Sequence, residues 1–147
     1  MPRRPRLTVA VRRQIAAREG YRCAYCRSPQ RVGIPMVVDH ILPLVAGGSS
    51  RLENLCLACY RCNEFKGRRT EGPDPVDGQM TSLFDPRRNA WAAHFAWQAD
   101  RVTLAGLTPV GRATISKLQL NRPGVLNLRR VLRREGAHPP RETVEES

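Results

Sequence analysis

The sequence predicts an α+β protein, in which a small zinc-stapled finger is wrapped by N-terminal and C-terminal helices. Two Cys-x-x-Cys pairs in the first half of the chain have the spacing of a structural zinc site. A β-branched run and a short helical segment lie within the stretch that ends with the second pair. Helical patterns with capping signals occupy the stretches before and after this finger.

The zinc prediction rests on the cysteines. Cys23 and Cys26 form the first pair, and Cys59 and Cys62 form the second. Two intervening residues let both thiolates of a pair reach one ion, and four thiolates complete a tetrahedral zinc site. Disulfides and buried free cysteines are the alternatives, but we find no signal peptide, which disfavours disulfides and fits a cytoplasmic protein. Cys56 takes the place of an apolar residue and is expected in the core.

The chain begins with a Pro/Arg-rich arm over residues 1–7, which we expect to be disordered and which could lie along phosphates. Thr8 has the character of an N-cap, and residues 9–19 form a predicted helix that Gly20 ends. Val11 and Ile15 share one stripe of this helix and should pack on the finger.

The next element is a predicted strand over residues 36–38, and His40 follows it beside Asp39. Imidazole titrates near neutral pH, so His40 is a candidate general base, with a structural histidine as the alternative. Adjacent residues of a regular strand point to opposite faces. Asp39 and His40 can therefore converge only if the strand ends or bends there, which Pro43 and the loop after it make plausible.

A short helix is predicted over residues 60–66, ended by Gly67. It carries Asn63 directly after Cys62. Carboxylate and amide oxygens suit a hard divalent cation such as magnesium, so Asp39 and Asn63 could share one.

These motifs together resemble the HNH endonuclease family, whose core is the ββα-metal fold, in its four-cysteine, zinc-stapled form. The resemblance covers about a third of the chain, from residue 21 to 69, and rests on the following matching residues: Cys23, Cys26, Asp39, His40, Pro43, Gly47, Gly48, Asn54, Cys59, Cys62, Asn63, Lys66 and Gly67. It implies that His40 is the general base and that Asp39 and Asn63 bind the catalytic metal. It also implies that Asn54 holds the loop that orients His40.

The function implied is divalent-metal-dependent hydrolysis of DNA phosphodiester bonds, which leaves 5′-phosphate and 3′-hydroxyl ends. Magnesium is the expected catalytic ion, with manganese possible, and zinc is structural. The alternative is a zinc-stapled module that binds DNA or RNA without catalysis, because the same cysteines and basic residues would serve it. Only the family resemblance separates DNA from RNA as substrate.

Charge also favours a nucleic-acid partner. The 147 residues include 25 basic and 13 acidic side chains, for a formal net charge of +12. No apolar run approaches the length that spans a membrane. We expect the following basic residues to contact phosphates: Arg61, Lys66, Arg68, Arg69, Arg129, Arg130, Arg133 and Arg134. For each of them, ordinary solvated surface charge is the alternative.

The chain divides into predicted parts: the arm over 1–7, an HNH core over 8–70, a mostly helical extension over 71–136 packed on that core, and a flexible tail over 137–147. Residues 68–77 read as a loop.

The extension contains a predicted helix from residue 85, with Trp91 and Phe95 on its apolar face, and a short strand over 102–104. Further helices are predicted from Thr108 or Pro109 to about 120 and from Pro123 to an end at Gly136. The last has an apolar face of Val125, Leu128, Val131 and Leu132. Of the other two histidines, we expect His94 to be structural and His138 to have no role.

Overall fold

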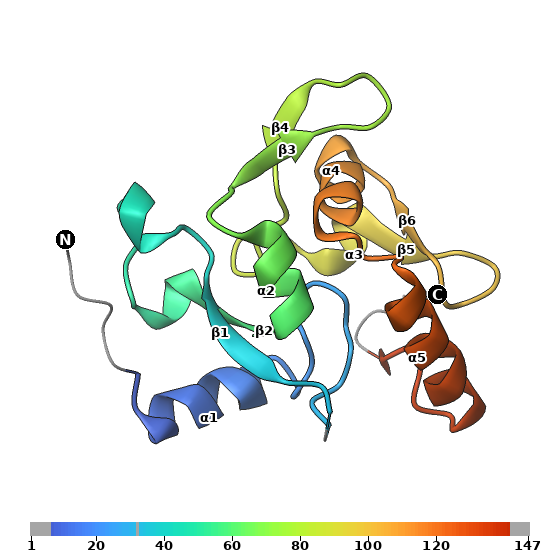
Figure 1. Ribbon diagram of the computed structural model, residues 1–147, viewed down its shortest axis with the longest axis horizontal. Helices are drawn as coiled ribbons and strands as arrows, with labels where there is room; N and C mark the ends of the chain where they lie inside the picture. The colour runs from blue at the N-terminus through green and yellow to red at the C-terminus, as the bar shows by residue number, and fades with distance from the viewer. Residues whose placement is uncertain (1–6, 32, 142–147) are drawn as a thin grey trace. The chain divides into compact units, whose positions relative to one another are not determined.

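The computed structural model describes residues 7–31 and 33–141, and its fold is mixed α+β, as predicted. The chain forms two compact units, one of residues 1–70 with 85–87 and one of residues 71–84 with 88–147. Figure 1 shows the elements of each. Most of the predicted N-terminal arm, residues 1–6, and the end of the predicted tail, residues 142–147, lie outside the described residues.

The first unit opens with helix α1 (Val9–Arg18), and Thr8 caps it by accepting a hydrogen bond from the Val11 amide at 3.2 Å. Its inner stripe packs as predicted: Ile15 is fully buried in the core, and Val11 lies against that core. Arg18 at its end donates to the carbonyl oxygens of Leu52, at 2.8 Å, and Leu55. This contact ties α1 to the segment that leads into the second strand.

Strand β1 (Met36–His40) pairs antiparallel with β2 (Leu55–Cys59), so that His40 lies opposite Leu55. Two short 3₁₀ turns, η1 (Leu44–Ala46) and η2 (Leu52–Asn54), connect them. Helix α2 (Tyr60–Lys66) follows β2 directly and ends at Gly67, as predicted. The β1–β2–α2 order places the predicted site residues at the end of a strand and along the helix that follows its partner (Figure 1).

The second unit combines two hairpins with helices. Strand β3 (Glu71–Pro73) pairs with β4 (Met80–Ser82), and β5 (Phe95–Trp97) pairs with β6 (Leu104–Gly106). Helix α4 (Pro109–Leu118), capped by Thr108, and helix α5 (Pro123–Arg134) confirm two of the predicted helices. The β3–β4 hairpin includes part of the predicted loop over 68–77, and the predicted strand over 102–104 begins only at Leu104.

The helix predicted from residue 85 is wrong. Residues 86–89 form a turn and a bend, α3 (Trp91–His94) is a single helical turn, and Phe95 already belongs to β5. Pairing with β6 accounts for the difference, because tertiary partners override a weak local helical pattern. On the predicted apolar face of α5, Val125 and Leu132 are buried as expected, but the prediction for Val131 is wrong, since it is 49% exposed.

Both histidines of this unit make contacts within it. His94 Nδ1 lies 2.6 Å from the Thr108 hydroxyl, and its structural role stays a prediction. The expectation that His138 has no role is wrong: it is buried, its Nε2 lies 2.8 Å from the Arg101 carbonyl, and its ring lies edge-on to Trp97.

The packing of the extension on the core stays a prediction. Among the described residues, we find no helix with the length and apolar character that membrane crossing requires.

Candidate active site and metal centre

The four paired cysteines form one cluster. Their sulfur atoms lie within 4.8 Å of one another, all four residues are buried, and Cys26 Sγ lies 3.8 Å from Cys59 Sγ. Tetrahedral zinc with Zn–S bonds of about 2.3 Å places its sulfurs about 3.8 Å apart. None of the five cysteines is in a disulfide. The donor set and the spacing therefore fit a structural zinc ion.

The local backbone brings each pair into position. The Cys23 amide donates to the Ser28 carbonyl at 2.9 Å, which closes the turn around the first pair. Cys59 caps α2, and its sulfur accepts from the Cys62 amide at 3.4 Å. Hydrogen bonds from the neighbouring thiols, that of Cys23 first, hold the pKa of Cys26 well below its usual range, whereas burial raises the pKa of Cys23 well above it.

Cys56 lies outside this cluster and inside the core, as expected. It is fully buried, and its sulfur lies 3.6 Å from the Tyr25 hydroxyl. Burial raises the pKa of the Cys56 thiol well above its usual value, and the charge of Asp39 acts in the same direction. Cys56 is therefore a neutral thiol that packs against the polar network beside it.

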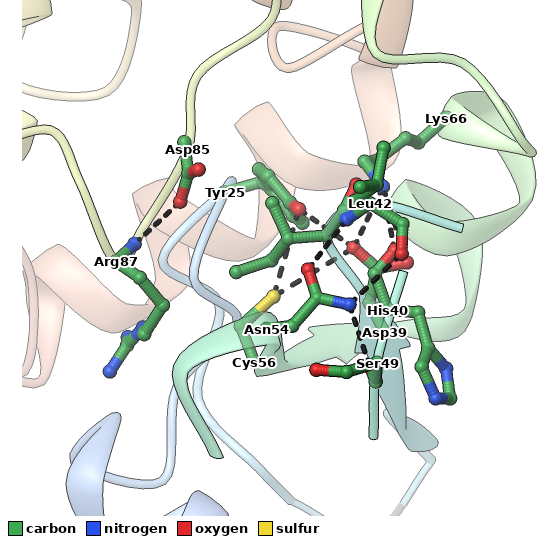
Figure 2. Close-up of polar contacts among 11 residues, drawn as sticks. Tyr25, Asp39, His40, Leu42, Ser49, Asn54, Cys56, Lys66, Asp85 and Arg87 are labelled. Carbon is green, nitrogen blue, oxygen red and sulfur yellow. Dashed lines mark hydrogen bonds and ion pairs between the residues drawn. The ribbon is translucent and has the colours of Figure 1, made fainter. Parts of the chain in front are cut away.

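That network is centred on Asp39, which is 4% exposed. Its Oδ2 accepts a hydrogen bond from the Tyr25 hydroxyl at 2.7 Å and lies 3.1 Å from Lys66 Nζ (Figure 2). Burial raises the pKa of Tyr25 well above its usual value, so the phenol keeps the proton that it donates. The carboxylate is thus held from both sides.

Lys66 is a buried member of the site. Only 2% of the residue is exposed, and its ammonium also donates to the carbonyl oxygens of His40, at 3.3 Å, and Ile41, at 3.1 Å. The expectation that Lys66 grips a flanking phosphate is wrong for this reason, since the ammonium is enclosed by oxygens of its own chain.

His40 lies at the last position of β1, and its Nε2 is 2.9 Å from the Ser50 hydroxyl. The imidazole points away from Lys66 (Figure 2), as the alternation of side chains along a strand requires. Asp39 contacts Tyr25 and Lys66, whereas His40 contacts Ser50. The convergence of Asp39 and His40 on one site stays a prediction. His40 is 9% exposed and is not part of the cysteine cluster.

Asn54 holds the connection between the two strands. Its Oδ1 accepts from the Leu42 amide at 2.9 Å, and its Nδ2 donates to the carbonyls of Leu42, at 2.9 Å, and Ser49, at 2.7 Å. Gly48 passes so close that a Cβ atom there would lie 1.8 Å from the Leu42 carbonyl oxygen. These contacts fix the loop that carries Ser50, the partner of His40.

Asn63 lies on α2, one turn before Lys66, and is partly buried. Residues three apart on a helix share a face, and Lys66 reaches Asp39 from that face. A carboxylate and an amide oxygen are ligands that magnesium accepts, and the divalent ion that Asp39 and Asn63 would share stays a prediction. The ammonium of Lys66 already lies against the same carboxylate.

The predicted DNA contacts fall into two groups. Arg61, Arg68 and Arg69 in the first unit are exposed, and Arg61 pairs with Glu64 at 3.0 Å.

In the second unit, Arg130, Arg133 and Arg134 are exposed. The prediction for Arg129 is wrong: it is 2% exposed, donates to the Val102 carbonyl at 2.9 Å and lies 5.0 Å from the Trp97 ring centre.

Sequence reasoning assigns no site role to Tyr25 or Ser50 and places Lys66 on the surface. Tyr25 lies between the first two zinc ligands, but nothing in that spacing says that its hydroxyl reaches Asp39. Ser50 follows a Gly-Gly-Ser run that reads as an ordinary flexible loop. A contact over such separations depends on tertiary structure, which the sequence pattern does not contain.

Two antiparallel strands followed by a helix, stapled by four cysteines and carrying an Asp-His pair at the strand end, define a ββα-metal domain. Residues 23–69 match the family model described as HNH endonuclease, so this segment is an HNH endonuclease domain, and its cysteine cluster fits the four-cysteine form. The match covers about a third of the chain.

A curated relative is the CRISPR-associated endonuclease Cas9 of Corynebacterium diphtheriae, which is 42% identical over 57 residues. That alignment covers 38% of this chain but only 5% of the relative, so the likeness concerns one domain of a much longer protein. No solved structure matches the chain.

Proposed function

We propose that this chain is a divalent-metal-dependent HNH endonuclease that hydrolyses DNA phosphodiester bonds, with His40 as general base. The observation that carries the proposal is the position of Asp39 and His40 at the end of β1, where Lys66 of α2 contacts the Asp39 carboxylate, within the segment that matches the HNH family. The family and the Cas9 relative support nuclease chemistry, and the domain has the parts that such chemistry needs.

Asp39 and Asn63 would hold the catalytic ion, for which magnesium is the proposed species and manganese a substitute. When bound, the ion would neutralise charge on the scissile phosphate and assist departure of the 3′ oxygen. Tyr25 and Lys66 keep the Asp39 carboxylate fixed before substrate arrives. Preorganised groups of this kind lower the barrier because they need little rearrangement during the reaction.

His40 would accept a proton from the attacking water at an imidazole nitrogen. The contact between His40 Nε2 and the Ser50 hydroxyl helps to orient the imidazole ring. Asn54 acts on the chemistry only through the loop, because its carboxamide bonds to Leu42 and Ser49. Attack by water opposite the leaving 3′ oxygen gives a 5′-phosphate and a 3′-hydroxyl.

The zinc ion would have no part in this reaction. Its four ligands are cysteines and leave no open position for substrate, which is the property of a structural site. Its role is to hold the turn after α1 and the start of α2 together, which keeps β1 and α2 at a fixed distance. DNA is the proposed substrate, and the net charge of +12 supports a polyanionic partner.

To test the proposal, the protein is freed of divalent ions other than its structural zinc and is then incubated with supercoiled plasmid. Addition of magnesium or manganese should give nicked circles, whose ends are then labelled to identify the 5′-phosphate and 3′-hydroxyl. EDTA should prevent the reaction. Plasmid binding without cleavage at any metal concentration would favour the alternative of a non-catalytic DNA-binding module, and cleavage of RNA alone would correct the substrate.

A further inference from the structure

We infer that Lys66 is a built-in counter-cation of Asp39 that lowers the affinity of the catalytic site for its divalent ion. The inference rests on the proposed function, because it concerns the metal that Asp39 and Asn63 would share. It assigns to Lys66 a positioning role that differs from a phosphate contact.

The ammonium of Lys66 is surrounded by oxygen atoms. Asp39 contributes Oδ1 at 3.4 Å and Oδ2 at 3.1 Å, and the carbonyl oxygens of His40 and Ile41 lie at 3.3 and 3.1 Å. The lysine is 2% exposed. A buried ammonium is stable only when paired and hydrogen-bonded, so the end of β1 is shaped to hold a cation.

The same oxygens are of the kind that magnesium binds. When the site holds no metal, Lys66 neutralises the buried Asp39 carboxylate and holds the backbone of His40 in place. When metal is present, Asp39 faces two cations, and the fixed positive charge of Lys66 opposes the second. Lys66 thus preorganises the site and at the same time weakens its metal affinity.

Three variants separate charge from hydrogen bonding. Lys66→Gln removes the charge but keeps N–H donors for the His40 and Ile41 carbonyls. Lys66→Arg keeps the charge. Lys117→Gln is the matched control, because Lys117 is the only other lysine and lies in the second unit.

The readout is the magnesium Kd, measured by calorimetry on protein whose zinc content and circular dichroism match those of the wild type. Lys66→Gln should bind magnesium roughly tenfold or more tightly, which is the scale of a unit charge a few ångströms away even in a high dielectric. Lys66→Arg and Lys117→Gln should keep the wild-type Kd. Equal or weaker binding by folded Lys66→Gln would overturn the inference, since Lys66 would then be a scaffold only.

A second measurement uses the wild-type chain and so does not depend on how the variants fold. With only two lysines in the sequence, side-chain ¹³Cε and ¹⁵Nζ NMR spectra contain two lysine signals. Magnesium should shift the Lys66 signal, as Asp39 exchanges part of its contact with the ammonium, and leave Lys117 unchanged. Metal binding with no change at Lys66 would contradict the inference.

These outcomes are distinguishable from failure of the proposed function. If the wild type neither binds magnesium nor cleaves DNA, the nuclease proposal fails and the inference falls with it. If the wild type binds and cleaves but Lys66→Gln keeps the wild-type Kd, only the inference fails.

Discussion

At the scale of single residues, the site depends on short contacts between groups that are far apart in the sequence. Asn54 joins Leu42 to Ser49 through three hydrogen bonds, and the close passage of Gly48 over Leu42 makes this possible. No other residue type fits at Gly48 without movement of the backbone, because the neighbouring atom is a carbonyl oxygen. The geometry at His40 therefore depends on a glycine that touches no substrate.

Replacement of Gly48 by alanine tests this dependence. The added methyl group would displace the Leu42 carbonyl and break its bond from Asn54, so we expect a loss of about 1–3 kcal/mol in unfolding free energy of the first unit and a fall in plasmid cleavage. Denaturant titration and the nicking assay measure both. Gly124→Ala is the matched control, since nothing lies within 4 Å of its Cβ position. Wild-type stability of Gly48→Ala would contradict the account.

The residue scale also separates what sequence can predict from what it cannot. The zinc ligands can be assigned from spacing, because a Cys-x-x-Cys turn is a local structure. The sequence predicts that Lys66 and Arg129 lie on basic surfaces, yet both are buried. Charged residues are rarely buried without partners, and the partners here, Asp39 for Lys66 and Val102 for Arg129, come from distant segments.

At the scale of elements, the zinc cluster is the staple of the first unit. It joins the turn after α1 to the N-terminus of α2. Helix α2 is only seven residues long. A helix of this length has little stability by itself, so we expect its position to depend on packing and on the zinc ion that the cysteines would hold.

Cys59→Ser should therefore lose zinc and unfold most of the first unit. Cys56→Ala is the matched control: it removes a buried cysteine that lies outside the cluster, so it should keep about one equivalent of zinc and lose only a modest part of the stability. Metal analysis and circular dichroism of the purified variants measure the difference. Equal zinc loss in both variants would show that the ligand set is misassigned.

The turn between β5 and β6 gives a prediction for pH. Hydrogen bonds from the Thr103 hydroxyl, at 2.6 Å, and from the Thr103 and Val102 amides lower the pKa of Asp100 to about 2. A pKa depressed on folding contributes stability that is present above the unfolded value of about 4 and is lost as pH falls toward about 2.

The second unit should lose stability over this interval, and Asp100→Asn should lose less. Both tryptophans of the chain, Trp91 and Trp97, lie in this unit, so denaturation followed by tryptophan fluorescence at pH 5, 4 and 3 reports on it alone. An identical pH dependence of wild type and variant would rule out a contribution from Asp100.

The elements that the sequence predicts well have strong local signals. The Thr8 and Thr108 caps and Gly67 mark helix ends that the structure confirms. The sequence predicts a loop in place of β3 because Gly72 and Pro73 are turn residues, but both are strand residues that pair with β4. Pairing between short strands is a tertiary property, which explains why it could not be predicted.

At the scale of the whole molecule, the net charge of +12 is the property that a nucleic-acid partner would sense first. In α5, Arg130, Arg133 and Arg134 remain as exposed candidates for DNA contact, whereas Arg129 holds the unit together from inside. The function of the second unit in DNA binding stays a prediction.

Replacement of all three exposed arginines by glutamine in one variant should weaken DNA binding. It should also reduce the slope of log K against log salt by up to about 2.7, since each phosphate that an arginine neutralises adds about 0.9 to that slope. Fluorescence anisotropy with a labelled duplex at several salt concentrations measures both quantities. Unchanged affinity and slope would show that the basic face of α5 takes no part. Tryptophan fluorescence is the control for folding of the second unit.

The resemblance that the sequence shows over residues 21–69 agrees with the family match over residues 23–69. The rest of the chain carries no comparable motif, and in the structure its residues 71–84 and 88–147 form a second compact unit. The reason is physical: ligands of one metal must recur at fixed spacing, whereas a helical and hairpin unit can be built from many sequences.

The most direct test of the central claim is the rate of magnesium-dependent plasmid nicking by His40→Ala. We predict a loss of at least about a hundredfold, the lower scale for a general base, with zinc content and DNA affinity unchanged. High manganese should restore part of the rate to Asn63→Ala, which lacks a ligand, but not to His40→Ala, which lacks a proton acceptor. Cleavage by His40→Ala at the wild-type rate would contradict the account.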